Sequence, residues 1–213
     1  MVHPAYFENM VKQRLELAMS YSKYGLVNEM INLLDDADGL IKSKSACFSS
    51  DFLENYVQEK ETLFYFGFVN GLSKNINDAR AFSEEGDVEK FYDAVDLVKI
   101  CAKELGEQVP DFSSEKISAY NKATSKNINE SYNFLDKKDF DTFKEFVSLA
   151  NSYFKETNNF RAEDIALLNN LLNSNSVTAT NKSSNLSSNL NSVDKQYIFN
   201  KKQEGSFSDI YLN

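Results

Sequence analysis

Three stretches of this chain share one pattern: LAMSYSKYGLVNEMINLLDDA at Leu17–Ala37, DARAFSEEGDVEKFYDAVDLV at Asp78–Val98, and ESYNFLDKKDFDTFKEFVSLA at Glu130–Ala150. Each starts as a helix-like stretch that ends in an aromatic residue. It then passes through a polar turn into a second helix, whose apolar residues recur at helical spacing. Self-similarity of this kind is typical of helical hairpins stacked on one another. The sequence therefore predicts an all-α fold of antiparallel hairpins.

The three stretches also share a register. The corresponding positions are Tyr21, Phe82 and Phe134 for the aromatic residue, and Gly25, Gly86 and Lys138 for the turn. The turn positions lie 61 and 52 residues apart. The extra length beyond a minimal hairpin falls before each return, so we expect long outgoing helices and shorter incoming ones.

Extending the periodic pattern to the rest of the chain predicts about seven helices. Their expected spans are 5–23, 27–43, 51–84, 87–105, 113–137, 140–155 and 162–172. Asp51, with Glu54 three residues later, has the pattern of a capping box at a helix start. The stretch from Asp51 is expected as one long helix or as two helices broken near Gly67 or Gly71.

Composition is consistent with helices and not with β-sandwiches or barrels. The chain has only 7 Gly and 2 Pro in 213 residues, whereas such folds need many turn residues. Its 17 Phe and 11 Tyr supply much of a core, without any Trp. A folded part of roughly 170 residues can bury about two-thirds of its unfolded-chain surface, which is enough for a core.

The net charge of −9 argues against nucleic acid and anionic lipid as partners, since both are polyanions. No stretch approaches about 18 uninterrupted apolar residues, so we expect no membrane span. The partner is therefore expected to be another protein. Nothing in the sequence sets the oligomeric state.

The cysteines and the N-terminus indicate the expected compartment. Cys47 and Cys101 belong to no CxxC or Cys/His cluster, which predicts two free thiols in a reducing compartment. The first 19 residues lack both an apolar run and a small-residue cleavage site, so we expect no signal peptide. These features predict a cytoplasmic protein.

No catalytic, metal or cofactor motif is recognisable. His3 is the only histidine, which leaves no general base on a helix for either cysteine, and no glycines are spaced for a phosphate loop. The cluster Asp35, Asp36, Asp38 and Gly39 resembles part of a calcium loop, but its twelfth position is Ser45 and not a bidentate acid. We interpret it as a solvated helix end and predict a non-enzyme without metal or cofactor.

The hairpins resemble tetratricopeptide repeats at their small and aromatic positions. The matching residues are Leu17, Ala18, Tyr21, Gly25, Val27, Leu34 and Ala37 in the first stretch, Ala79, Phe82, Gly86 and Val88 in the second, and Ser131, Phe134, Phe140 and Ala150 in the third. The stretches depart from that family at Met30, Phe91 and Phe143, where it has a small residue, and in their period, which exceeds its typical ~34 residues. An irregular helical bundle of related hairpins is the alternative.

The resemblance implies a function in protein–protein interaction. In tetratricopeptide-like proteins the concave face formed by the first helix of each hairpin holds a partner's peptide or helix. By this resemblance we expect binding residues at Tyr21, Tyr24, Phe82 and Phe134, although several of them must be core. The expected function is a non-catalytic adaptor or scaffold.

The most apolar run is LFYFGFV, at Leu63–Val69. It could line a groove that takes a partner's peptide, or belong to a helix buried on all sides at the centre of the array. Of the two, we expect the buried helix.

The composition changes after residue 172, which predicts a helical-repeat domain over 1–172 and a different tail. Residues 173–193 are rich in Ser and Asn without helical period, as in a flexible linker. Residues 194–213 contain two apolar clusters and are expected to form a docking segment, with Tyr197, Phe199, Phe207 and Tyr211 as its contact residues. The alternative is an end that packs loosely on its own domain.

Two roles are open for such a docking segment. It could occupy the protein's own groove and regulate it, or anchor the protein to a second partner. The alternative function for the whole chain is a structural subunit of a larger complex, whose tail threads into a neighbour.

Overall fold

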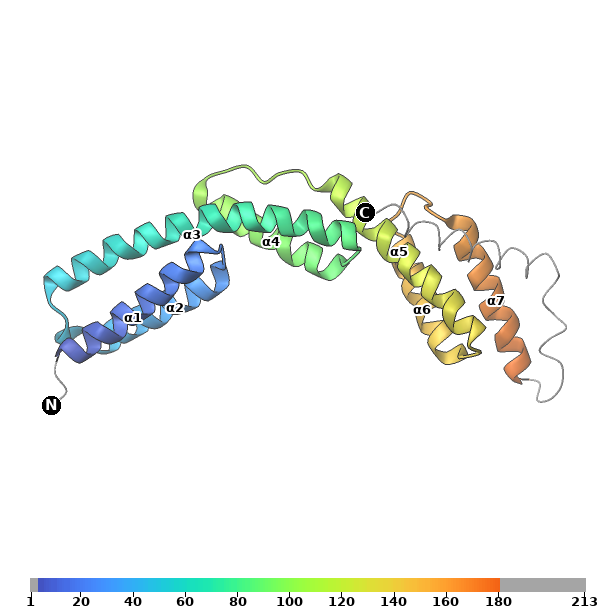
Figure 1. The fold of residues 1–213 in the computed structure, drawn as a ribbon, viewed down its shortest axis with the longest axis horizontal. Helices are drawn as coiled ribbons and strands as arrows, with labels where there is room; N and C mark the ends of the chain where they lie inside the picture. The colour runs from blue at the N-terminus through green and yellow to red at the C-terminus, as the bar shows by residue number, and fades with distance from the viewer. Residues whose placement is uncertain (1–3, 181–213) are drawn as a thin grey trace, which may run out of the picture. The chain divides into compact units, whose positions relative to one another are not determined.

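Every regular element in the described part of the chain is a helix. The computed structural model describes residues 4–180, with side chains as far as residue 174. The helices in this range are α1 (Pro4–Lys23), α2 (Val27–Ser43), a short 3-10 helix η1 (Ser45–Cys47), α3 (Ser50–Glu85), α4 (Val88–Leu105), α5 (Ser113–Asp136), α6 (Phe140–Phe154) and α7 (Ala162–Thr180) (Figure 1). The predicted all-α fold of about seven helices is confirmed.

The start of α3 differs from the prediction. The helix begins at Ser50, and the backbone N–H of Phe52 donates to Ser49 Oγ at 3.2 Å. Ser49 is therefore the capping residue, and Asp51 lies in the first turn. The capping box expected at Asp51 and Glu54 is wrong, because a serine two residues earlier already satisfies a backbone donor.

The last helix is longer than expected. We predicted that it ends at residue 172, but α7 continues to Thr180, so the first part of the stretch expected as linker is helical. The rest of that linker lies outside the described residues. So does the expected docking segment at 194–213, with its four contact residues Tyr197, Phe199, Phe207 and Tyr211.

The three aligned turns have the same backbone conformation. Gly25, Gly86 and Lys138 all have positive φ, at 65°, 73° and 60°. In the first turn the N–H of Leu26 donates to the Tyr21 carbonyl at 3.1 Å. A bond of this span closes a helix through one left-handed residue. The register predicted for the turns is confirmed.

The described residues form two compact units. Unit 1 contains the residues up to Phe82 together with Glu89–Glu115, and unit 2 contains Ser83–Val88 together with the residues from Lys116 onward. The residues expected to form one helical-repeat domain are therefore divided between two units.

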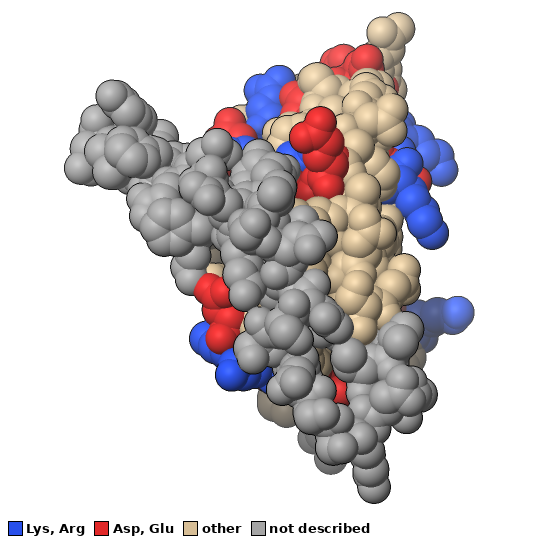
Figure 2. Space-filling view, turned by 90° about the vertical axis from the view of Figure 1, so that its right-hand side faces the viewer, with Lys and Arg blue, Asp and Glu red and all other residues tan. Residues whose placement is uncertain are grey.

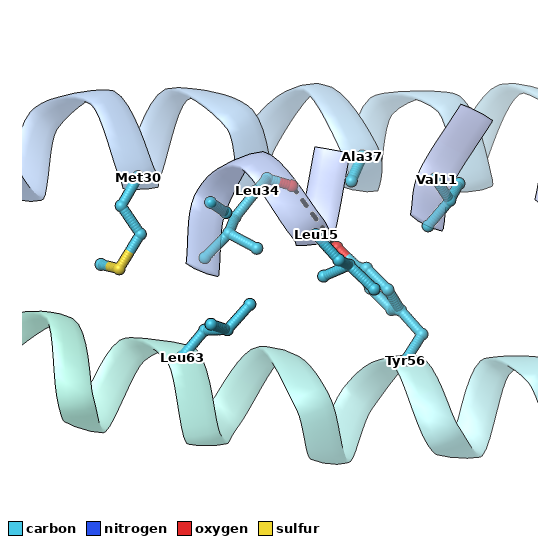
Figure 3. Packing of buried hydrophobic residues seen from close by; sticks show 8 residues of the cluster. Val11, Leu15, Met30, Leu34, Ala37, Tyr56 and Leu63 are labelled. Carbon is cyan, nitrogen blue, oxygen red and sulfur yellow. Dashed lines mark hydrogen bonds between the residues drawn. The ribbon is translucent and has the colours of Figure 1, made fainter. Parts of the chain in front are cut away.

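In unit 1 the α1–α2 hairpin packs on the N-terminal half of α3 (Figure 3). The α2 residues in this core recur at helical spacing, as the sequence predicted. The core residues are Val11, Leu15, Ala18, Met30, Leu34, Ala37, Tyr56 and Leu63. Burial of each large apolar side chain contributes roughly 1.5–3 kcal/mol.

The core of unit 2 joins α5, α6 and α7. Its buried residues are Ile128, Tyr132, Phe143, Val147, Ala150, Ile165, Leu168 and Leu171. Phe143 and Ala150 align with Met30 and Ala37 of unit 1, and all four are fully buried. The aligned positions therefore have the same role in both units.

Glycines let the first hairpin approach α3 closely. A Cβ on Gly25 would lie 2.7 Å from the Asn70 carbonyl oxygen, and a Cβ on Gly67 would overlap Met30 Sδ. The sequence left open a break near Gly67 or Gly71, but α3 is one continuous helix. The two glycines instead leave room for the first hairpin to pack closely against it. Met30, large where tetratricopeptide repeats are small, packs against a glycine on the neighbouring helix.

The second hairpin makes the equivalent contact within unit 2. A Cβ on Gly86 would lie 2.8 Å from the backbone nitrogen of Ala123 on α5. We call the approach of Gly25 to Asn70 and Gly71, and that of Gly86 to Lys122 and Ala123, the turn contacts. Lys138, at the third aligned turn, has an exposed side chain.

The internal repeat is longer than the sequence pattern first indicated. SKNIN occurs at Ser73–Asn77 on α3 and again at Ser125–Asn129 on α5, 52 residues later. Asn75 Nδ2 donates to the Gly71 carbonyl, and Asn127 Nδ2 to the Ala123 carbonyl, both at 2.7 Å. Both asparagine side chains are buried. Each buried amide nitrogen therefore has a hydrogen-bond acceptor on its own helix, at the residue that takes part in the turn contact.

A polar cluster joins α2 to α3 at the edge of the unit 1 core. Tyr56 donates to Asp38 Oδ1 at 2.6 Å, and Lys60 pairs with Asp38 Oδ2. Burial acts to raise the pKa of Asp38, but the hydrogen bonds from Lys60 and Tyr56 outweigh it and hold that pKa below its usual range. Asp38 lies inside α2, so the interpretation of residues 35–39 as a solvated helix end is wrong.

We expect Asp38→Asn to lower the free energy of unfolding by about 1 kcal/mol at pH 7. The value is small because the Asp38 side chain is 44% exposed and solvent screens the pair. The pKa of Asp38 is lowered by folding, so its contribution is present above the unfolded pKa, about 3.9, and is lost as pH falls below it.

Urea unfolding followed by circular dichroism at pH 7 and at pH 3 checks this expectation. The difference between wild type and Asp38→Asn should shrink at pH 3. The exposed Asp36, on the same helix, provides the control variant Asp36→Asn, expected to stay within about 0.5 kcal/mol of wild type. An equal loss at both pH values would contradict the assigned role of the Asp38 charge.

Candidate interaction surface on α3

The described residues contain no cluster of side chains suited to metal binding and no cysteine activated as a nucleophile. No group of three or more His, Cys, Asp or Glu among them could hold a metal ion. Both cysteines are free, and burial raises the pKa of the Cys101 thiol, which is the opposite of what an activated nucleophile needs. The features that remain as candidates are on the surface.

The apolar run at Leu63–Val69 lies in the middle of α3 and faces two ways. Leu63 and Phe68 are buried, whereas Tyr65 is 61% and Phe66 is 55% exposed. A helix turns 100° per residue, so seven consecutive apolar residues cover its whole circumference. The expectation that this helix is buried on all sides is wrong.

Three residues form what we call the α3 apolar face: Tyr65, Phe66 and Val69. The two rings meet edge to face, with centroids 5.7 Å apart and an interplanar angle of 72°. Val69 follows them by one helical turn, at spacings that place it beside both. Large aromatic side chains in contact with each other and with water are typical of binding surfaces.

The opposite side of α3 holds this face in place. Gly67 and Gly71 make the close contacts with α2 and the first turn, and they lie about half a turn around the helix from Tyr65 and Val69. Asn70 Nδ2 donates to the Ser22 carbonyl at 3.0 Å and fixes the end of α1 to α3. The rings therefore project from a helix anchored by close packing.

An acidic flank adjoins the face toward the N-terminus of α3. Glu61 is exposed one turn before Tyr65, and Glu54 is exposed two turns further back on the same side. Lys60 points elsewhere, because it pairs with Asp38 and lies over the Phe64 ring at 5.4 Å. Neither Glu54 nor Glu61 has an ion pair with any described residue.

Three of the binding residues predicted from the sequence are packing residues. Tyr21 packs against the unit 1 core. Phe82 is half-buried, and Lys90 Nζ lies over its ring at 5.5 Å from the centroid. Phe134 stacks on Phe146, with ring centroids 5.3 Å apart. The three rings therefore pack within their own units, close to the aligned turns. By contrast Leu17, which the tetratricopeptide resemblance places among packing residues, is 46% exposed.

Tyr24 is the one predicted residue in the described range whose side chain is free to reach a partner. It is 70% exposed and lies on the turn where Gly25 touches Asn70. The first turn packs on the side of α3 that carries Gly71, about half a turn around the helix from Val69. Tyr24 is therefore exposed at a packed turn, and it does not belong to the α3 apolar face, which sequence reasoning missed.

The face of the molecule in Figure 2 provides a comparison. Its described part has an uncharged strip with acidic and basic side chains at the margins, and α7 carries no charged residue after Asp164. The apolar residues Ile165, Leu168 and Leu171 of α7 face the unit 2 core. From Ile165 to residue 174, where its side chains are described, α7 has no charged residue and exposes no large apolar side chain, so α3 provides the stronger candidate.

Comparison of the chain with protein-family models, with curated proteins and with solved structures finds no match. Among the described helices, none has the length and apolar character needed to cross a bilayer. The assignment of function therefore depends on the surface of α3.

Proposed function

We propose that this protein is a non-catalytic interaction module, an adaptor or scaffold that binds a peptide or helical segment of a partner protein on the α3 apolar face. The observation that supports this most is the pair of adjacent rings, Tyr65 and Phe66, exposed on a helix whose opposite side is closely packed. Aromatic anchors on a rigid support contribute much of the affinity of protein interfaces. The two free cysteines support a cytoplasmic location.

A single exposed apolar residue would not support this proposal, because surfaces of monomeric proteins carry many. The α3 face differs because its three residues are contiguous and two of them are aromatic. Ordering them costs little entropy, since an aromatic side chain has only two rotatable bonds and the helix beneath it is fixed.

Peptide display tests the proposal. A library of random twelve-residue peptides would be panned on the full chain, and enriched peptides measured by fluorescence anisotropy. We expect micromolar ligands whose Kd rises at least tenfold on Phe66→Ser, as expected for the loss of an aromatic anchor. Circular dichroism should show unchanged helicity, because Phe66 is mostly exposed.

The matched control is Ile100→Ser on α4. Ile100 is 44% exposed and lies on a different helix, so this variant removes a similar apolar side chain without touching the face. Its Kd should equal that of wild type. Failure to enrich any peptide, or equal loss in both variants, would contradict the proposed function.

A further inference from the structure

The chemistry of the partner segment can be inferred from how this chain covers its own rings. Lysines of the described chain lie over rings at 4.8–5.9 Å from the centroid: Lys12 over Phe52, Lys44 over Phe7, Lys60 over Phe64, Lys90 over Phe82, Lys116 over Tyr120 and Lys137 over Phe134. No lysine or arginine of the described residues lies over Tyr65 or Phe66 in this way. The two rings with the most exposed position on α3 have no cation of their own.

The lysines nearest to the face along α3 are already engaged. Lys60, on the N-terminal side, pairs with Asp38 of α2, and Lys74, on the C-terminal side, pairs with Asp78. The negative faces of the Tyr65 and Phe66 rings therefore remain open to a cation from outside.

The acidic flank points to the same chemistry. Glu54 and Glu61 are exposed on the side of α3 that leads to Tyr65 and have no described basic partner. A positive charge arriving here would meet one ring face and one carboxylate within a single helical turn. A negative charge would be repelled by Glu61 and by the net charge of −9.

Resting on the function proposed above, we infer that the partner segment is basic and apolar. It carries lysine or arginine beside one or two large apolar residues. The apolar residues pack on Val69 and the ring edges, while a cation lies over Tyr65 or Phe66 and beside Glu61. Recognition then depends on two independent features, one apolar and one electrostatic, and only the second weakens with salt.

Three synthetic peptides separate these features. Each is a fluorescein-labelled ten-residue peptide. The first has two lysines on each side of a Tyr-Ile-Phe centre, the second has glutamates in place of the lysines, and the third has serines in place of the centre. Anisotropy titrations with the full chain at 50 and 300 mM NaCl give Kd values for each.

We expect the lysine peptide to bind at least tenfold more tightly than either other peptide at 50 mM NaCl. Its affinity should fall several-fold at 300 mM, and severalfold again on Glu61→Gln. The matched control is Glu89→Gln, an exposed acid on α4, which should leave the Kd unchanged. Equal binding of the lysine and glutamate peptides, or no effect of Glu61→Gln, would overturn the inference.

The design distinguishes this inference from the proposed function. If display yields ligands that depend on Phe66 but carry no basic residue, the interaction function stands and the inference of a basic partner is wrong.

Residues 195–202 of this chain, KQYIFNKK, themselves have the inferred chemistry. If Tyr197→Ser with Phe199→Ser in the full chain tightens probe binding, the occupant is this segment and the inferred separate partner is overturned.

Discussion

The Gly25→Ala variant is expected to lose about 2–5 kcal/mol of its free energy of unfolding, the sum of left-handed backbone strain and overpacking. Gly25 has φ of 65°, and a Cβ there would lie 2.7 Å from the Asn70 oxygen and 2.9 Å from its carbonyl carbon. Neither atom can rotate away, because both belong to the α3 backbone. The loss is a large part of the 5–15 kcal/mol typical of whole domains.

Urea unfolding followed by circular dichroism measures this loss, and amide hydrogen exchange across α3 locates it. Two glycines separate its causes. Gly106→Ala, at φ of 70° with nothing within 4 Å, should show the strain alone, about 1–2 kcal/mol. Gly39→Ala, inside α2 with open space around it, should stabilise by about 1 kcal/mol. Equal losses in Gly25→Ala and Gly106→Ala would contradict the turn contact.

Lys138→Gly serves as the converse control. Lys138 has a left-handed backbone, with φ of 60°, which is strained for a residue with a Cβ, and its side chain is exposed. Removing that side chain should therefore raise stability by up to about 1 kcal/mol.

Arg161→Met is expected to cost about 3 kcal/mol, because it leaves a buried carboxylate without its main cation. Asp164, in the first turn of α7, is 2% exposed, and Arg161 Nε donates to its Oδ2 at 2.7 Å. Arg161 also reaches Asn129 of α5 at 3.3 Å. The favourable position of Asp164 near the helix N-terminus limits the loss but does not remove it.

A thermodynamic cycle tests this assignment by urea unfolding. The double variant Arg161→Met with Asp164→Asn should recover part of the loss, since no uncompensated charge remains. The comparison pair is Lys99 with Asp96, where both side chains are more than half exposed. Lys99→Met should cost no more than about 0.5 kcal/mol. No recovery in the double variant would show that Arg161 acts by packing alone.

The periodicity of the three stretches was sufficient to predict that helices flank turns at Gly25, Gly86 and Lys138. The structure adds that all three turn residues have positive φ, as expected where a helix ends through one left-handed residue. The same periodicity could not show which side of α3 would be covered. It places Tyr65 and Val69 together but does not say whether another helix packs over them.

One signal in the sequence could have located the α3 apolar face. Gly67 and Gly71 are spaced by one helical turn, which indicates the side where another backbone approaches, and the side opposite them carries Tyr65 and Val69. The buried ion pair of unit 2 had no signal in the local sequence. The burial of Asp164 and its pairing with Arg161 depend on α5 and α7 meeting, and no periodic pattern encodes that.

The turn contacts also limit where helices can pack this closely. Each needs a glycine on one hairpin and a small residue, Gly71 or Ala123, on the helix that receives it. At the third turn Lys138 replaces the glycine, so this turn carries a side chain where the other two carry none. A helix could not approach the third turn as closely as α3 approaches Gly25 without displacing that side chain. Within the described residues, the series of close turn contacts therefore ends at the second hairpin.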